Sequence, residues 1–379
     1  ILAYVSTILF KAKCRVGRYV SPTIFGYRER IQVNGVSISR EDLTRLTEKV
    51  ERVGAQMLSE GLRHPTMFEA ETAVAFLYFL EQGCEIVVLE AGMGGRTDAT
   101  NVIQNTLVAV LASISMDHMG FLGDTLFEIA ENKAEIIKPG CMVVSVKQME
   151  EAERAVMERS KKVGCSVVVA DADAAVHRKR GLFQQTFDYK EQESVEIALS
   201  GEYQFINAVA ALEVVEALRK KGYQIPEEAV RSGLKETVWK GRFTVVAREP
   251  YVIVDGAHNR DAAKRLRETI EQYLSDKRLI YIMGVLADKE YERVIEETVS
   301  FASEIVTVMT PDNERALPAE KLAEAVAKYY VPVQAAESIA DAVERAYALA
   351  RKEDVILAFG SLSYLGELIR QVERRTSDD

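Results

Sequence analysis

The 379-residue sequence is poor in cysteine and histidine, with only four of each. The cysteines are scattered over positions 14, 84, 141 and 165, and no two of them form a C-x-x-C pair. A disulfide framework and a structural zinc site both need several closely placed ligands, so the sequence argues against both. We expect reduced, buried thiols and a cytoplasmic location.

Long apolar runs and an excess of positive charge are also missing. No uninterrupted apolar stretch is long enough to span a bilayer. Acidic residues number 58 against 48 Lys and Arg, which gives a net charge of −10, and the longest basic cluster spans only residues 177–180. The sequence therefore predicts neither a membrane nor a nucleic-acid partner. A few well-placed cations are still enough to bind a small anionic substrate.

The composition that is present, 48% hydrophobic and 28% charged, is typical of a globular protein of two domains or one large one. In the first half of the chain, apolar segments of strand length alternate with helical patterns. The strand segments are residues 85–90, 107–113, 141–146 and 166–170, and the helical patterns are residues 40–60, 67–82, 124–137 and 148–163. Continuous apolar strands separated by helices predict a parallel sheet covered on both faces.

The pattern changes after residue 170. Residues 171–199 are polar and irregular and predict a small antiparallel appendage, after which helical periodicity returns. A second alternating series then predicts strands at residues 251–255, 279–284, 304–309 and 355–359, with helices at 261–273, 289–299, 318–327, 339–351 and 364–373. We predict an α/β protein with domains at residues 1–238 and 243–379 and a linker at 239–242.

A glycine-rich segment follows the apolar strand at residues 85–90. It begins at Glu90 and contains Gly92, Gly94 and Gly95. The spacing is not G-x-G-x-x-G, and the segment leads into another strand rather than a helix, so a dinucleotide-binding oxidoreductase is disfavoured. Taken alone, the pattern favours a tight turn with Glu90 in a structural role.

Two of the four histidines follow predicted strands. His118 comes after the strand at 107–113, and His258 lies in the D-G-A-H-N segment that closes the strand at 251–255. Open α/β sheets bind their ligands at this edge. The alternative for His118 is a helix cap with an exposed imidazole. The alternative for the D-G-A-H-N segment is a strand-to-helix turn in which Asn259 caps the helix, and this is compatible with ligand binding. Lys133, on a predicted helix, by itself favours a solvated surface lysine.

Together these motifs resemble the folylpolyglutamate synthase / dihydrofolate synthase family of Mur-type amide ligases. The resemblance covers nearly the whole chain in the family's order. The segments that carry it are residues 21–24, 27–31, 66–69, 89–101, 116–118, 131–134, 201–208, 239–243 and 255–259. Three positions depart from the family's usual residues, because Thr23 and Tyr203 stand where His is usual and Lys240 where Pro is usual.

The resemblance implies a two-domain fold. The first domain would be a P-loop-NTPase-like parallel sheet with helices on both faces and a small antiparallel appendage. The second would be a smaller, Rossmann-like Mur ligase C-terminal domain. The family's opening strand and Gly-rich phosphate loop are not in the sequence, which starts at about the residue after them. We expect a fragment of a complete enzyme, or a product without the loop whose catalysis would be crippled.

The resemblance also implies the catalytic and metal-binding residues. Glu90 and His118 would bind Mg²⁺, and Lys133 would join them if it is carbamylated by CO₂. An imidazole is an unusual ligand for Mg²⁺, which prefers oxygen. Carbamylation needs a neutral amine, so the surroundings of Lys133 must favour its uncharged form.

Other residues are implied to bind the nucleotide and the substrates. The expected ATP contacts are Asn207, Arg242, Asp255 and His258. The expected substrate contacts are Ser21, Arg28, Phe68, Arg315 and Ser361. The alternatives are ordinary core packing for Phe68 and a linker arginine for Arg242.

The implied reaction is the ATP- and Mg²⁺-dependent ligation of L-glutamate to a folate or dihydropteroate carboxylate through an acyl phosphate. The resemblance further implies a cytoplasmic monomer whose only partners are small-molecule substrates. Two other readings stay open: a catalytically inactive truncated relative, and another Mur-type amide ligase acting on a cell-wall precursor.

Overall fold

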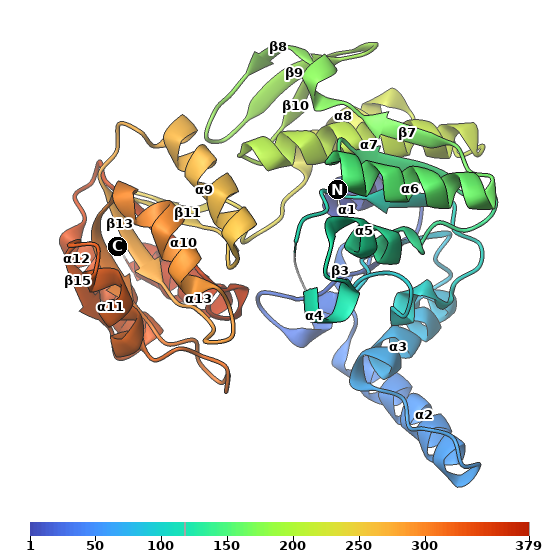
Figure 1. The fold of residues 1–379 in the computed structure, drawn as a ribbon, viewed down its shortest axis with the longest axis horizontal. Helices are drawn as coiled ribbons and strands as arrows, with labels where there is room; N and C mark the ends of the chain where they lie inside the picture. The colour runs from blue at the N-terminus through green and yellow to red at the C-terminus, as the bar shows by residue number, and fades with distance from the viewer. Residues whose placement is uncertain (117–118, 379) are drawn as a thin grey trace. The chain divides into compact units, whose positions relative to one another are not determined.

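The structure is a computed structural model that describes residues 1–116 and 119–378 (Figure 1). The chain divides into two compact units. The first consists of Ile1–Lys179, Thr186–Ala198 and Gln204–Thr237, and the second of Arg180–Gln185, Leu199–Tyr203 and Val238–Asp379. None of the helices in the described part of the chain is long and apolar enough to cross a membrane.

The described strands of the first unit form three sheets, with the orders β3-β2-β1-β4, β5-β6-β7 and β10-β9-β8. Their bounds are β1 Val16–Tyr19, β2 Ile31–Val33, β3 Val36–Ser37, β4 Ile86–Leu89, β5 Val108–Leu111, β6 Met142–Val146, β7 Val167–Ala170, β8 Val176–Lys179, β9 Gln185–Tyr189 and β10 Gln192–Ile197. The α/β class is confirmed, with parallel pairs β1–β4, β5–β6 and β6–β7. β4 pairs with β1, however, so the strands predicted as one sheet are divided between two.

The hairpin of β2 and β3 is missing from the sequence-based prediction. Its turn residues Asn34 and Gly35 have φ angles of 50° and 80°. Asn-Gly favours a two-residue turn in which both residues have positive φ, because this turn matches the twist of the strands. The Asn-Gly turn signal was therefore present in the sequence. The hairpin was not predicted because both of its strands are very short.

Side-chain caps explain where several helices of the first unit begin. Ser39 accepts a hydrogen bond from the backbone of Asp42, and Thr66 and Thr125 each form a capping box with a glutamate three residues later. The helices are α1 Leu2–Lys11, α2 Arg40–Ser59, α3 Met67–Glu81, α4 Met119–Leu122, α5 Leu126–Ala134, α6 Glu150–Val163, α7 Glu202–Lys220 and α8 Glu227–Glu236. Figure 1 shows α2 extending outward beside α3.

The second unit is built on one six-stranded sheet of order β11-β12-β16-β13-β14-β15. Only β11 is antiparallel to its neighbour. The strands are β11 Thr244–Arg248, β12 Tyr251–Val254, β13 Leu279–Met283, β14 Ala302–Thr307, β15 Val333–Ala335 and β16 Val355–Phe359. The prediction lacked β11 and β15, the two edge strands, most of whose residues are only partly buried or exposed.

Helices pack against this sheet around a core that includes Tyr281, Leu357 and Phe359, all fully buried. The helices are α9 Arg260–Tyr273, α10 Tyr291–Thr298, α11 Ala319–Ala327, α12 Ile339–Leu349 and α13 Leu362–Asp378. Asn259 caps α9 by accepting a hydrogen bond from the backbone of Ala262 at 2.9 Å. The predicted cap in the D-G-A-H-N segment is thus confirmed.

Candidate functional site

Ser21 and Glu90 meet at the carboxyl ends of β1 and β4. These strands are parallel neighbours, so the residues that follow them emerge at the same edge of the sheet. The backbone nitrogen of Ser21 donates to Oε2 of Glu90 at 3.0 Å, and the backbone nitrogen of Glu90 donates to the carbonyl of Tyr19 at 2.9 Å. Glu90 is exposed. The structure therefore brings together one predicted catalytic residue and one predicted substrate contact.

The glycine turn after β4 is attached to α5. Oδ1 of Asn132 accepts from the backbone nitrogens of Gly95 and Arg96, at 3.2 and 3.3 Å. The side chain of Asn101 donates to the carbonyls of Gly95 at 2.8 Å and Glu135 at 3.2 Å. These bonds join the turn to the residues on both sides of Lys133.

Gly95 has no room for a side chain. A Cβ at this position would lie 2.7 Å from the carbonyl oxygens of both Asn132 and Lys133. The backbone of the turn therefore lies directly on the last turn of α5. Lys133 is half-buried there. The segments that carry Glu90 and Lys133 are consequently held as one rigid piece.

Phe68 lies against the other side of the glycine turn. A Cβ on Gly92 would come 2.4 Å from the Phe68 ring, and the ring centroid of Phe68 is 6.0 Å from that of Tyr19. Phe68 is only partly buried, at the start of α3. Arg28 is exposed on the short helix Tyr27–Arg30, and it donates to the carbonyl of Ile38 at 2.9 Å.

A buried ion pair beside this group was missed by the sequence analysis. Arg30 pairs with Glu71, which is 6% exposed on α3. Burial, followed by a hydrogen bond to Glu71, raises the pKa of Tyr27 to about 12. The guanidinium of Arg30 also lies over the Tyr27 ring, 5.3 Å from its centroid. The available signal was an acidic residue on the otherwise apolar, buried face of the helix predicted at 67–82.

The structure describes some of the predicted metal ligands but not all of them. His118 lies outside the described residues, and within the described part of the chain no three His, Cys, Asp or Glu side chains gather as a metal site. The carboxylate of Glu90 fits Mg²⁺ as a hard oxygen donor. The Lys133 ammonium has no lone pair for a metal, so this residue fits only after conversion to a carbamate.

Asp255 organises the site of the second unit. This carboxylate is 5% exposed and accepts hydrogen bonds from the Tyr203 hydroxyl at 2.9 Å and from the backbone nitrogens of Phe243 at 2.8 Å and Ala257 at 2.9 Å. Burial raises its pKa, and the charge of Arg242 and these hydrogen bonds oppose the rise. These three donors leave one acceptor position of the carboxylate, on Oδ1, for the predicted ribose contact.

Arg242, His258 and Ser361 surround the turn that follows Asp255. A Cβ on Gly256 would lie 2.1 Å from Nη1 of Arg242, so the guanidinium rests on this glycine. Nδ1 of His258 is 2.8 Å from the carbonyl of Gly256. The backbone nitrogen of Gly360 donates to the carbonyl of Ala257 at 2.9 Å, which places the buried Ser361 beside the same turn.

Of the two remaining predicted residues, Arg315 belongs to the second unit and Asn207 to the first. Arg315 is exposed in a loop of the second unit and forms an ion pair with Asp288 at 2.9 Å. Asn207 lies in the first turns of α7 and donates to Gln204 at 3.4 Å. For both residues, the residue type and position in the family motif are the only signals that point to a ligand.

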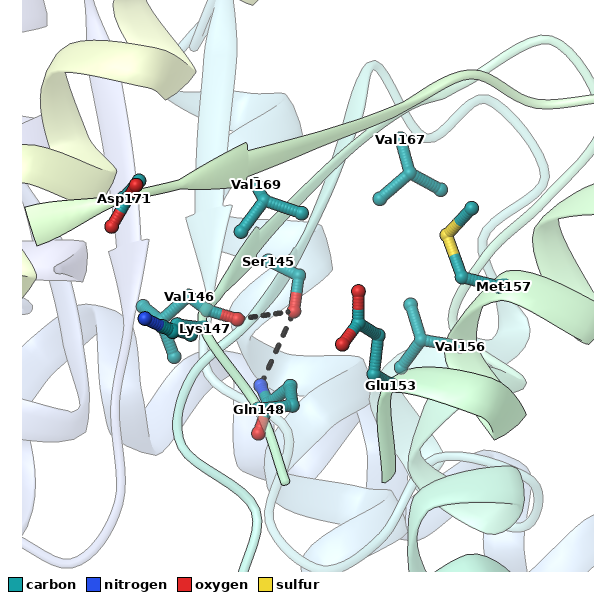
Figure 2. Close-up of a pocket in the computed structure, with 10 residues that line it drawn as sticks. All are labelled: Ser145, Val146, Lys147, Gln148, Glu153, Val156, Met157, Val167, Val169 and Asp171. Carbon is teal, nitrogen blue, oxygen red and sulfur yellow. Dashed lines mark hydrogen bonds between the residues drawn. The ribbon is translucent and has the colours of Figure 1, made fainter. Parts of the chain in front are cut away.

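A pocket of about 240 Å³ lies between β6, β7 and α6 (Figure 2). Its lining combines the hydroxyl of Ser145 with the side chains of Val156, Met157 and Val167. The Ser145 hydroxyl accepts from Nε2 of Gln148 at 3.2 Å. None of the residues that line this pocket is a predicted site residue.

Two family models match the chain. The model of the Mur ligase middle domain matches residues 40–215, and that of the Mur ligase, glutamate ligase domain matches residues 241–362. The dihydrofolate synthase/folylpolyglutamate synthase of Bacillus subtilis (strain 168) is 30% identical over 98% of this chain and 87% of its own length. The chain belongs to the folylpolyglutamate synthase / dihydrofolate synthase family of Mur ligases.

Two solved structures of this family share the fold. One is Mycobacterium tuberculosis folylpolyglutamate synthase complexed with ADP and AMPPCP, 28% identical with a TM-score of 0.87 over 99% of this chain and 87% of that one. The other is Escherichia coli FolC in complex with DHPP and ADP, 27% identical with a TM-score of 0.83 over 99% of this chain and 86% of that one. The predicted two-domain Mur ligase fold is therefore confirmed.

Proposed function

We propose that this protein ligates L-glutamate to a carboxylate of a folate or of dihydropteroate, with ATP as the energy source. The observation that supports this most directly is the joining of Glu90, Ser21 and the Lys133 helix through the glycine turn. The family membership of the whole chain supports the same reaction. The protein would act as a cytoplasmic monomer, with small molecules as its only partners.

The reaction consists of two transfers. An oxygen of the substrate carboxylate attacks the γ-phosphorus of ATP, the bond to ADP breaks, and an acyl phosphate forms. The glutamate amine then attacks the acyl carbon, loses a proton and displaces phosphate. Little covalent help from the protein is needed, because positioning and charge stabilisation dominate phosphoryl transfer.

We assign the roles of these residues from the family motifs. Glu90, His118 and a carbamylated Lys133 would hold Mg²⁺, which neutralises charge on the phosphates when bound. Asn132 and Asn101 keep the Glu90 turn fixed against α5. Carbamylation replaces the Lys133 cation with an oxygen anion, which is the change that makes this side chain a suitable ligand.

The other proposed contacts divide between nucleotide and substrates. Arg242, His258 and Asn207 would bind ATP, with Arg242 offering a forked guanidinium to the phosphates. Asp255 would hold Arg242 and the turn in place and would contact the ribose through its remaining acceptor position. The proposed contacts of the folate or pterin and of glutamate are Ser21, Arg28, Phe68, Arg315 and Ser361.

The test is ADP release by the purified protein with Mg-ATP and L-glutamate, adding dihydropteroate or tetrahydrofolate in turn. Release that depends on both glutamate and one acceptor, with a product heavier by one glutamyl residue, is the expected result. Release with a cell-wall precursor instead would favour another Mur-type ligase. A folded protein that binds Mg-ATP but releases no ADP with any acceptor would favour an inactive relative.

Glu90→Gln tests the proposed metal ligand within this reaction. The amide keeps an oxygen and the size of the side chain but removes the charge, so we expect higher Mg²⁺ concentrations to be needed for the same rate. Glu85→Gln, at the opposite end of β4, is the matched control. An unchanged Mg²⁺ dependence in Glu90→Gln would remove Glu90 from the proposed site.

A further inference from the structure

Two of the four cysteines lie against each other at the amino-terminal ends of β6 and β7. The sulfur atoms of Cys141 and Cys165 are 3.8 Å apart. β6 and β7 are parallel, with Val143 opposite Val167, so Cys141 and Cys165 each lie two residues before these paired positions. Both cysteines are free. The pair therefore results from strand register and not from closeness in sequence.

The other two cysteines show whether strand register alone brings two sulfur atoms into contact. Cys14 and Cys84 also precede two parallel strands by two residues, because Val16 lies opposite Ile86. Among the four cysteines, all of which lie in the described residues, the structure gives a sulfur–sulfur contact only for Cys141 and Cys165. Equal register therefore does not by itself produce the contact.

The two thiols of the pair differ in accessibility. Cys141 is 4% exposed and belongs to the core beneath α5 and α6, whereas Cys165 is half-buried at its edge. Burial raises the pKa of Cys141 and keeps it protonated. The thiol of Cys165 donates to the carbonyl of Lys138 at 3.1 Å. A reagent from solution therefore meets Cys165 first, with Cys141 directly behind it.

We propose that Cys141 and Cys165 form a dithiol redox site that is oxidised to an intramolecular disulfide by a small-molecule disulfide. Neighbouring strands lie about 4.8 Å apart, which is within the Cα separation that a disulfide spans. The sulfurs are already in van der Waals contact, so bond formation needs side-chain rotation rather than a change of strand pairing. The proposal does not depend on the proposed ligase activity.

The chemistry is two successive thiol–disulfide exchanges. The Cys165 thiolate attacks one sulfur of oxidised glutathione, which forms a mixed disulfide and releases one glutathione thiol. Cys141, whose proton passes to the departing glutathione, then attacks the sulfur of Cys165 and releases the second glutathione. Two protein thiols are oxidised, one glutathione disulfide is reduced to two thiols, and the two protein protons end on the released thiols.

The disulfide would tie together two connections of the first unit. Cys141 ends the connection from α5, the helix of Lys133, and Cys165 lies within the short connection from α6 to β7. The closed loop contains β6 and α6, which restricts the unfolded chain. We therefore expect the oxidised protein to unfold at a temperature higher by roughly 5 °C.

The experiment treats the folded, full-length protein with oxidised glutathione, quenches it with acid, and alkylates the remaining thiols. The expected mass spectrum shows a protein with two alkylated cysteines instead of four and no glutathione adduct, and lighter by two hydrogen atoms once the alkyl groups are subtracted. Peptide mapping should join the segments around residues 141 and 165, and dithiothreitol should reverse the change. Free, alkylated Cys141 and Cys165 at a glutathione disulfide concentration that modifies Cys14 or Cys84 would overturn the proposal.

Cysteine-to-serine variants test the two thiol–disulfide exchanges separately. Cys141→Ser should stop at a stable glutathione adduct on Cys165, and Cys84→Ser should form the disulfide as the unaltered protein does. If Cys141→Ser fails to fold, Cys165→Ser supplies the second test, because it should give neither adduct nor disulfide at Cys141. A stable adduct on Cys165 in the unaltered protein would show that Cys141 does not resolve it, and would contradict the proposal.

Discussion

Oδ1 of Asn132 lies 3.2 Å from the backbone nitrogen of Gly95 and 3.3 Å from that of Arg96. One side-chain oxygen thus fixes the turn that follows Glu90 to the residue that precedes Lys133. The carbonyl of Asn132 accepts a further bond from Arg96 at 3.2 Å. The relative position of two proposed catalytic residues therefore depends on a side chain that need not touch either substrate.

Removal of this amide should lower activity more than stability. Asn132→Ala leaves the backbone nitrogen of Gly95 without this acceptor and that of Arg96 with only the Asn132 carbonyl. We expect kcat to fall about 10- to 100-fold, because small displacements of reacting groups have large effects on rate. Asn132→Asp keeps an acceptor oxygen and should recover most of the rate. Steady-state kinetics with Mg-ATP, glutamate and the acceptor would measure both.

The control for this prediction is Asn34→Gly. Asn34 also holds a backbone donor, Val16 at 2.8 Å, and glycine suits its positive φ. This variant should lose stability while kcat stays within about twofold. Equal losses of kcat in Asn132→Ala and Asn34→Gly would indicate a general loss of stability rather than a positioning role for Asn132.

The close approach of the glycine turn to α5 predicts that Gly95→Ala is destabilising. Its Cβ would lie 2.7 Å from two carbonyl oxygens, which are backbone atoms and cannot rotate away. We expect the free energy of unfolding to fall by about 1–3 kcal/mol, as for an overpacked core. Gly26→Ala is the control, since no atom lies within 4 Å of its Cβ and φ is 178°. Urea unfolding of both variants would measure the two free energies of unfolding.

Tyr203→Phe should destabilise the protein in a way that depends on pH. It removes a hydrogen bond to the buried carboxylate of Asp255, and this loss should lower the free energy of unfolding by about 1–3 kcal/mol at neutral pH. The hydrogen bond lowers the pKa of Asp255 against the larger effect of burial, so its removal raises that pKa further.

The sign of the pH effect follows from this shift. A carboxylate with a raised folded-state pKa is most stabilising when protonated, and this contribution is lost as pH rises through the folded-state pKa. The deficit of Tyr203→Phe should therefore shrink as pH falls through the pKa of Asp255. Tyr251→Phe, a partly buried tyrosine of the same unit, should show a small deficit at every pH. A deficit in Tyr203→Phe that does not change with pH would exclude the carboxylate as its cause.

Breaking the buried ion pair of Arg30 and Glu71 should lower the free energy of unfolding more than breaking an exposed ion pair does. Arg30→Met leaves a charge that is only 6% exposed without its partner, and we expect a loss of about 3–5 kcal/mol. Arg45→Met removes an exposed partner of Glu81 and should cost less than about 1 kcal/mol. Guanidinium unfolding curves would measure both. Similar losses would mean that Glu71 is stabilised by groups other than Arg30.

Local patterns were sufficient for most of the elements. The apolar run that became β16 and the capping residues Ser39, Thr66 and Asn259 act within a few residues, so the sequence determined them. The motifs also identified Glu90, Lys133 and the D-G-A-H-N turn as candidates. These signals are local because a hydrogen-bonded cap or an apolar strand depends on its immediate neighbours.

Tertiary structure alone decided which distant residues meet. Nothing in the sequence pairs Asn132 with Gly95, Arg30 with Glu71, Tyr203 with Asp255 or Cys141 with Cys165, because each contact depends on strand order, register and helix placement. The same holds for the division of the predicted parallel strands between two sheets. Sequence patterns specify which residues must be buried or capped, and only the packing of whole elements determines the partner that each buried group finds.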